Sequence, residues 1–165
     1  MQRFSTKTQV LGLVGWLVVV FIAAGVGSVA SIEAASFYNQ LAQPSWGPPA
    51  SAFGPVWSVL YVLMAVAAWL VWREGGFAAH RRALGVFVLQ LVFNALVTWL
   101  FFAWRQGALA MVDIALVWVL IVVCIVLFWR ARPLAGWLLV PYLAWTTFAG
   151  VLNYTVWQLN PQALG

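Results

Sequence analysis

Residues 108–129 read ALAMVDIALVWVLIVVCIVLFW, an apolar run interrupted by one charged residue, Asp113. Because an α-helix rises about 1.5 Å per residue, a run of this length crosses the hydrocarbon core of a bilayer, which is about 30 Å thick. Strands of a membrane barrel would instead alternate apolar and polar residues over about 9–11 positions. Four more apolar runs, without any charged residue, occupy 8–32, 52–72, 83–104 and 133–157. The sequence therefore predicts an all-α fold, a single domain over residues 1–165 built as a bundle of five transmembrane helices.

The composition of the whole chain excludes a soluble domain. Hydrophobic residues make up 65% of the sequence and charged residues 7%, against about 25% charged residues in an average soluble protein. The first run follows Arg3 and Lys7 and so has the flanks of a signal peptide, but at about 25 residues it is longer than the apolar region of such a peptide. We therefore expect it to remain as a transmembrane helix.

The basic residues are distributed unevenly between the two sides of the predicted bundle. With alternating spans, Arg105 stands alone on the side that receives the connection 33–51 and the C-terminal tail. The other side receives Arg3, Lys7, Arg73, Arg81, Arg82, Arg130 and Arg132. Cytoplasmic loops of membrane proteins carry such an excess of Lys and Arg. The formal charge of +5 therefore predicts a cytoplasmic N-terminus and an outer C-terminus in a bacterial inner membrane, and argues against a nucleic-acid partner.

Residue types that commonly carry chemistry are scarce. Cys124 and His80 are the only cysteine and histidine, which excludes an intrachain disulfide and a cysteine-rich metal site. His80 stands beside two arginines in a polar connection, where we expect a solvated side chain. Asp113 lies near the start of a predicted helix, whose dipole favours an acid there, and no second titratable group at membrane depth completes a proton relay. We therefore expect a structural role for Asp113, and no metal ion, cofactor or catalytic residue.

Polar and aromatic residues gather in the outer half of the predicted bundle, beneath the connection 33–51. Residues four apart share one face of a helix, so three sets of side chains define three faces. The sets are Trp57 with Tyr61, Gln90 with Asn94 and Thr98, and Trp145 with Ala149 and Asn153. Polar side chains in a membrane face the bundle interior, where they either bind a ligand or only join one helix to another. Both interpretations stay open at this point, and Trp46 in the connection is placed to cover the same site.

Four segments carry a resemblance to a known family. The connection contains FYNQLAQPSWGPP at 37–49, and the second run begins with FGPVWSVLY at 53–61. The third run contains QLVFN at 90–94, with Phe101 and Phe102 beyond it, and the fifth reads PYLAWTTFAGVLNYTVW at 141–157. In order and spacing these segments resemble the translocator protein family, the tryptophan-rich sensory proteins that include the mitochondrial peripheral-type benzodiazepine receptor.

The resemblance implies a five-helix bundle, commonly a homodimer, that binds porphyrins and other flat hydrophobic ligands beneath a long first loop capping the pocket. Together with the helix faces above, it gives the expected ligand-binding residues: Trp46, Trp57, Tyr61, Gln90, Asn94, Thr98, Phe101, Trp145, Ala149 and Asn153. Two departures affect the pocket wall, since Val97 stands where the family usually has Trp and Trp99 where Pro is common. A cholesterol motif proposed for mitochondrial members requires Lys or Arg soon after Tyr154, and the chain has neither.

A membrane receptor or carrier for tetrapyrroles is the function that these observations favour. Aromatic side chains would supply stacking area, and Asn94 would orient the ligand. The alternative is a light-dependent porphyrin-degrading enzyme in which Trp residues take part in redox steps, and a third hypothesis is a small efflux or scaffold protein. The chain contains no catalytic dyad or cofactor motif, which favours binding over catalysis. We expect a homodimer through small residues of the first run, Gly12 with Gly15 or Ala24 with Ser28.

Overall fold

The computed structural model describes residues 4–32 and 34–165 and confirms the all-α fold. Five helical segments are long and apolar enough to cross a membrane. They are α1 (Thr6–Ala30), α3 (Phe53–Trp72), α5 (Arg81–Thr98) continued by the π-helical turn η2 (Trp99–Ala103), α6 (Gly107–Ala131) and α7 (Pro133–Leu159). The short elements are α2 (Ala34–Gln40), η1 (Ala50–Ala52), α4 (Gly76–Ala79) and α8 (Pro161–Leu164).

Local sequence signals set several helix ends. The Ser5 hydroxyl accepts a hydrogen bond from the backbone N–H of Thr8 at 3.2 Å and so caps the start of α1. Pro133 occupies the first turn of α7, where its missing N–H leaves no helical bond unmade. Arg105 adopts a φ of 52°, the left-handed conformation, and this turn reverses the chain between η2 and α6.

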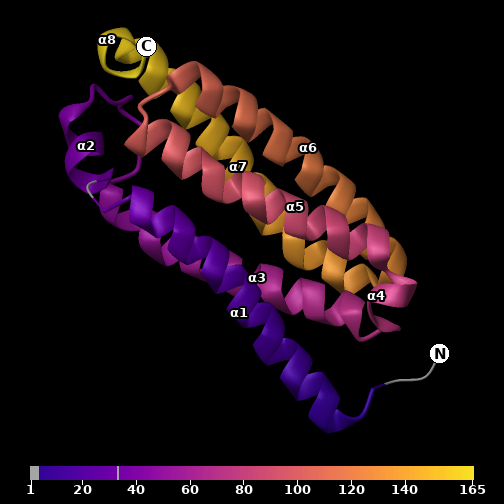
Figure 1. Cartoon of the computed structure of the whole chain (residues 1–165). Helices are drawn as coiled ribbons and strands as arrows, with labels where there is room; N and C mark the ends of the chain where they lie inside the picture. The colour runs from indigo at the N-terminus through magenta and orange to yellow at the C-terminus, as the bar shows by residue number, and fades with distance from the viewer. Residues whose placement is uncertain (1–3, 33) are drawn as a thin grey trace.

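The long helices form two groups. α5, α6 and α7 pack together, most extensively α6 against α7, and α1 lies along α3 on the other side of the bundle (Figure 1). α3 also contacts α7, and α1 contacts α5, so the two groups close on each other. The segment containing α2 and the C-terminal helix α8 lie together at one end, and α1 begins at the other (Figure 1). An odd number of spans therefore separates the start of α1 from the C-terminus across the bundle.

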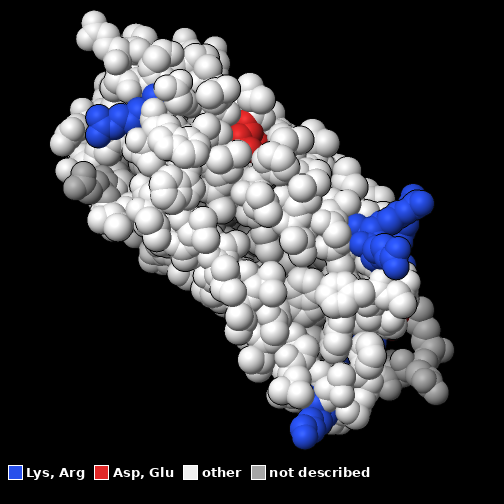
Figure 2. All heavy atoms as spheres, viewed as in Figure 1, with Lys and Arg blue, Asp and Glu red and all other residues white. Residues whose placement is uncertain are grey.

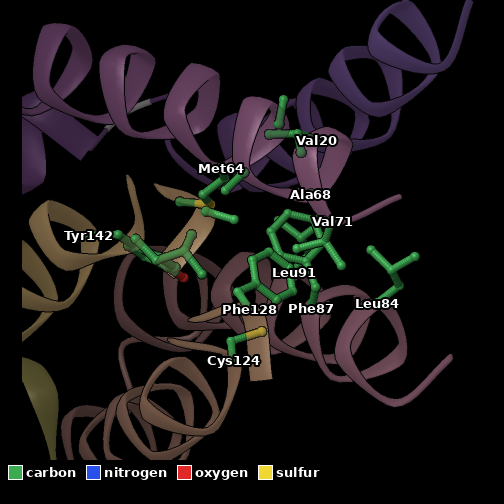
Figure 3. Close-up of a cluster of buried hydrophobic side chains, with 14 of the residues drawn as sticks. Val20, Met64, Ala68, Val71, Leu84, Phe87, Leu91, Cys124, Phe128 and Tyr142 are labelled. Carbon is green, nitrogen blue, oxygen red and sulfur yellow. The ribbon is translucent and has the colours of Figure 1, made fainter. Parts of the chain in front are cut away.

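The core lies where the two groups meet. Figure 3 shows Met64, Phe87 and Phe128 at its centre, and each of these side chains is 0% exposed. The rings of Phe87 and Phe128 stack with their centroids 5.7 Å apart. On α3, Ala65 and Ala68 are also fully buried, and their small side chains let neighbouring backbones approach closely, as is usual in membrane bundles.

The outer surface of the bundle is apolar along its length. Ile22 is 62% exposed, Val92 60% and Val112 66%. A continuous apolar surface of this kind is foreign to a soluble monomer and suits contact with lipid. On the face in Figure 2, blue side chains gather where α5 begins and α6 ends and at the start of α1, with one more group at the opposite end.

This charge distribution gives the molecule a basic end. We use that name for the end that carries the described basic residues other than Arg105, namely Lys7, Arg73, Arg81, Arg82, Arg130 and Arg132. Arg3, which the sequence also assigns to this end, lies outside the described residues. That the basic end faces the cytoplasm stays a prediction.

α1 is packed into the bundle as a membrane span would be. It buries Trp16 and Val20 in the core, where they are 6% and 0% exposed. The indole Nε1 of Trp69 on α3 donates a hydrogen bond to the backbone oxygen of Gln9 at 2.7 Å. These contacts accord with a retained transmembrane helix.

One of the two glycines proposed for the dimer contact is already engaged within the chain. A Cβ at Gly12 would overlap the ring of Trp72, whereas a Cβ at Gly15 would meet nothing within 4 Å. Gly12 therefore makes room for α3 of the same chain. Ala24 and Ser28, at the exposed face of α1, remain the candidate small-residue pair for a homodimer.

Candidate functional site

A hydrogen-bonded group of four side chains joins α3, α5 and α7 inside the bundle. The hydroxyl of Tyr142 donates to Oε1 of Gln90 at 2.6 Å and accepts from Nδ2 of Asn94. The hydroxyl of Tyr61 lies 3.5 Å from Oδ1 of Asn94, at the long limit of a hydrogen bond. Tyr142 and Gln90 are each 1% exposed and Asn94 7%. Three expected site residues thus meet, and Tyr142 connects two of them.

Tyr142 was not among the residues predicted for the site. Its position contained a usable signal, because Tyr142 precedes Trp145 by three residues and Ala149 by seven, spacings that place side chains on one helix face. What the sequence did not provide was the contact between α5 and α7. That contact brings the Tyr142 hydroxyl to Gln90 and Asn94, which alone satisfy it.

Aromatic rings extend from this polar group toward the end of the bundle that contains α2. Trp57 packs edge to face on Tyr142, with ring centroids 6.1 Å apart. One turn further along α7, Trp145 lies 5.3 Å from Phe148 and 6.1 Å from Phe53. Trp57 and Trp145, both predicted for the site, are therefore placed on two helices around the same region.

The connection between α1 and α3 covers this aromatic region, as expected from the sequence. Trp46 packs against Phe148 with centroids 5.9 Å apart and is 49% exposed, so it lies at the outer edge. Tyr38 packs against Phe53 at 5.4 Å, and its hydroxyl donates to the backbone oxygen of Pro48 at 3.2 Å. Burial raises the pKa of Tyr38 above its ordinary value of 10.0, which keeps the hydroxyl protonated as a donor at neutral pH.

Asn160 fastens the connection to the end of α7. Its Oδ1 accepts from the backbone N–H of Ala42 at 2.9 Å, and its Nδ2 donates to the backbone oxygen of Ala42 at 2.8 Å. Nδ2 also donates to the backbone oxygen of Val156 at 2.8 Å. A side chain just beyond the last span therefore holds the cover in place, and no motif in the sequence pointed to it.

Ala149 and Asn153 continue the α7 face beyond Trp145. Ala149 is half-buried, and Asn153 is 8% exposed. The predicted line on α7 thus runs from the aromatic region toward the C-terminal end of the helix, with a small side chain between two larger ones.

Thr98 and Phe101 lie outside the polar group. The hydroxyl oxygen of Thr98 would be 3.5 Å from a Cβ at Gly27, so Thr98 faces α1. A step of four residues turns a helix by about 400°, and two steps from Gln90 therefore rotate Thr98 by about 80° away from that residue's direction. Phe101 packs under the connection, 6.3 Å from Phe37, and contributes to the cover and not to the polar group.

Several polar atoms in this part of the bundle are buried without a hydrogen-bond partner among the described residues. They are Nε2 of Gln90, Oδ2 of Asp113, Nε1 of Trp145, Oγ1 of Thr146 and Nδ2 of Asn153. Nearly all buried polar groups in proteins are paired, because an unpaired one costs about 1–3 kcal/mol. This concentration of unused donors and acceptors distinguishes the region from a purely structural contact between helices.

The polar group closes the site from below. A void lined by Phe87, Gln90, Ile121, Cys124, Leu139 and Tyr142 is too small to admit a water molecule. The layer of Tyr142, Gln90 and Asn94 therefore forms the floor, one turn deeper than the Trp145 and Ala149 level predicted from the sequence. Within residues 4–32 and 34–165, no three His, Cys, Asp or Glu side chains lie close enough together to hold a metal ion.

Comparison with known proteins identifies the family. Residues 15–158 match the TspO/MBR family. The human translocator protein is 42% identical over 130 residues, covering 78% of this chain and 77% of the human one. The tryptophan-rich protein TspO of Chlorobaculum tepidum is 39% identical over 127 residues (76% and 80% of the two chains), and protein CrtK of Rhodobacter capsulatus is 38% identical over 130 residues (76% and 79%). Taken with the five apolar helices, these matches show that the chain is an integral membrane protein of the TspO/MBR family.

Proposed function

We propose that this protein is a membrane receptor or carrier that binds porphyrins and related flat hydrophobic molecules between α3, α5 and α7, beneath the connection that contains α2. The observation that carries the proposal is the arrangement of Trp57 and Trp145 above a polar floor with unused hydrogen-bonding atoms. The aromatic faces suit a flat ring system, and the polar atoms suit its heteroatoms. Pockets for small molecules combine these two features.

Each part of the site has a role in this proposal. Trp145 and Trp57 supply stacking surfaces, since an aromatic stack contributes about 1–3 kcal/mol per ring. Trp145 Nε1 is a buried donor without a partner, so a ligand acceptor can use it at no cost in protein hydrogen bonds. Ala149 leaves space beside Trp145, and Asn94 fixes the orientation of the floor through Tyr142.

A carrier role accords with how the cover is attached. Trp46 lies half-exposed at the edge, and the connection is fastened to α7 through one side chain, Asn160. Release of that contact would open a path to the site without disturbing the core. The word translocator in the name of the human relative describes movement of a cargo and supports a carrier over a static scaffold.

Titration of protoporphyrin IX into the purified protein, followed by quenching of Trp fluorescence in the dark, tests the proposal. Saturable quenching with a stoichiometry of one porphyrin per chain is the expected result. Quenching that grows linearly with porphyrin and equals that of free tryptophan at matched absorbance would show partition into detergent and would contradict it.

The same complex distinguishes a receptor or carrier from a porphyrin-degrading enzyme. We expect the porphyrin absorbance of the complex to remain constant in the dark and to fall under light no faster than that of porphyrin in empty detergent micelles. A light-dependent loss that requires the folded protein and diminishes in a Trp145→Phe variant would establish the enzymatic alternative.

Assembly is a separate part of the proposal. We expect a homodimer through the face of α1 that bears Ala24 and Ser28, since small side chains allow close backbone contact in lipid. Crosslinking in native membranes, with cysteine placed at position 24 after Cys124→Ser, should give a dimer band. A monomer at every crosslinker concentration, with cysteines at positions 24 and 28, would contradict this face.

A further inference from the structure

A hollow of about 360 Å³ opens at the basic end of the bundle, remote from the site described above. It lies between the start of α5 and the end of α6. Its lining consists of Ala78, Ala79, His80, Arg81, Arg82, Ala83, Leu127, Arg130 and Ala131, and we call it the basic groove. Figure 2 shows blue side chains gathered where α5 begins and α6 ends.

The arginines of the basic groove have no acidic partner among the described residues. The one ion pair found there joins Arg132 to Glu74 at 3.7 Å, and neither residue lines the groove. Arg81, Arg82 and Arg130 are exposed, and each carries a full positive charge that no carboxylate compensates. Three such charges around one hollow create a local positive potential that attracts an anion.

Position decides which anion is available. α5 begins and α6 ends at the groove, and both helices are long and apolar enough to span a membrane. Charged groups at the ends of membrane spans lie at the level of the lipid headgroups. The most concentrated anions at that level are the phosphates of phospholipids.

The walls of the groove also suit a lipid. Ala83, Leu127 and Ala131 give it an apolar side next to its charged rim. Along the same two helices, toward the bundle centre, Leu89 is 45% exposed on α5 and Val126 is 45% exposed on α6. A headgroup phosphate held by the arginines would therefore have its acyl chains on an apolar surface, which a free inorganic anion would not use.

We propose that the basic groove is a binding site for the phosphate headgroup of an anionic phospholipid, held by Arg81, Arg82 and Arg130. Arginine suits this ligand because its planar guanidinium forms paired hydrogen bonds with phosphate oxygens. His80 contributes to the wall with a fixed orientation, since its Nε2 lies 3.0 Å from the backbone oxygen of Glu74. The proposal is independent of the porphyrin site, which lies at the other half of the bundle.

The test compares two double variants that remove the same charge from the same end. Arg82→Gln with Arg130→Gln removes two groove arginines. Lys7→Gln with Arg73→Gln is the control, because neither residue lines the groove and Arg73 packs over the ring of Trp69 at 4.5 Å. Native mass spectrometry of each purified protein, titrated with dioleoyl phosphatidylglycerol or with the neutral dioleoyl phosphatidylcholine, gives the affinity for each lipid.

We expect the unmodified protein to bind one phosphatidylglycerol in preference to phosphatidylcholine. The groove variant should bind phosphatidylglycerol about 30-fold more weakly, as about 1 kcal/mol for each arginine near an anionic lipid surface predicts. The control variant should stay within about threefold of the unmodified protein. Arg82→Lys with Arg130→Lys should fall between the two, since lysine keeps the charge and loses the paired hydrogen bonds.

Two outcomes would overturn the proposal. Equal losses in the groove and control variants would show that the basic end attracts anionic lipid only through its total charge. Displacement of phosphatidylglycerol by inorganic phosphate at the same concentration as the lipid would show a free-anion site instead. Unchanged melting temperatures for both double variants exclude misfolding as the cause of a loss, and these exposed side chains should leave the melting temperature unchanged.

Discussion

The hydroxyl of Tyr142 on α7 donates a hydrogen bond to Oε1 of Gln90 on α5 at 2.6 Å. The same hydroxyl accepts from Nδ2 of Asn94, so one phenol joins the two polar side chains of α5 to α7. Because all three side chains are buried, water cannot replace either bond. This contact makes the floor of the candidate site a part of the stability of the bundle.

Replacing Tyr142 with Phe should therefore destabilise the protein. The substitution keeps the ring and leaves Gln90 and Asn94 with unpaired buried atoms, which costs about 1–3 kcal/mol. Thermal unfolding in one detergent, followed by circular dichroism, measures the change. Tyr154→Phe is the matched control, since Tyr154 is 52% exposed on the same helix, and it should leave the melting temperature unchanged. Equal melting temperatures for the two variants would show that the buried bonds add no stability.

Trp145 and Ala149 should control porphyrin affinity. If a porphyrin stacks on Trp145, Trp145→Ala should weaken binding about 5- to 150-fold, the equivalent of about 1–3 kcal/mol. Ala149→Phe should weaken it at least as much by filling the space, with unchanged helix content. Trp137→Ala is the control, because Trp137 is 59% exposed at the basic half of α7. Normal porphyrin binding by a folded Ala149→Phe protein would refute the pocket.

A purely structural role for Trp145 has a different outcome. In that case Trp145→Ala lowers the melting temperature and leaves the porphyrin affinity unchanged, because the ring only packs against Phe148 and Phe53. Measuring the affinity and the melting temperature on both variants separates the two roles.

Asn160 should control how firmly the cover is held. Asn160→Ala removes the side-chain hydrogen bonds to Ala42 and Val156, and should speed hydrogen exchange of the backbone amides at 41–49. If the cover limits ligand entry and release, both rates of porphyrin exchange should rise together, with little change in affinity. Asn39→Ala, at an exposed position of α2, is the matched control. Unchanged exchange at 41–49 in Asn160→Ala would show that other contacts hold the cover.

Two glycines of α1 should respond in opposite ways to alanine. A Cβ at Gly12 would overlap the ring of Trp72, which itself stacks on Phe4 at 4.5 Å, so Gly12→Ala should cost about 1–3 kcal/mol. Gly15→Ala meets nothing and should stabilise α1 by up to about 1 kcal/mol through its helix propensity. Melting temperatures in detergent give both values. A loss of dimer on Gly15→Ala, without loss of monomer fold, would move the proposed dimer face to Gly15.

The orientation of the bundle is open to a direct test. The excess of basic residues predicts that the basic end, and with it the N-terminus, faces the cytoplasm. Reporter fusions to the two termini should give a cytoplasmic signal at the N-terminus and an outer-side signal at the C-terminus. Two cytoplasmic termini would contradict the five-span topology or its orientation.

The sequence alone determined the number and approximate limits of the membrane helices. Apolar runs such as 108–129 leave no alternative to helices, because every backbone polar group in lipid must be paired within its own segment. The two-sided charge distribution and the tryptophan-rich motifs were likewise readable from the chain. Spacing by four residues correctly joined Gln90 with Asn94, since a helix repeats about every 3.6 residues.

Only the tertiary structure decided which faces meet. Thr98 follows the same spacing, yet the accumulated rotation of α5 turns it toward Gly27 on α1. Tyr142 became the centre of the polar floor because α7 packs against α5 at that level, a contact between residues 52 positions apart in the chain. Asn160 reaches Ala42 across 118 positions. Helix periodicity fixes the direction of a side chain on its own helix, whereas its partners depend on how helices distant in sequence are packed, and no local pattern encodes that packing.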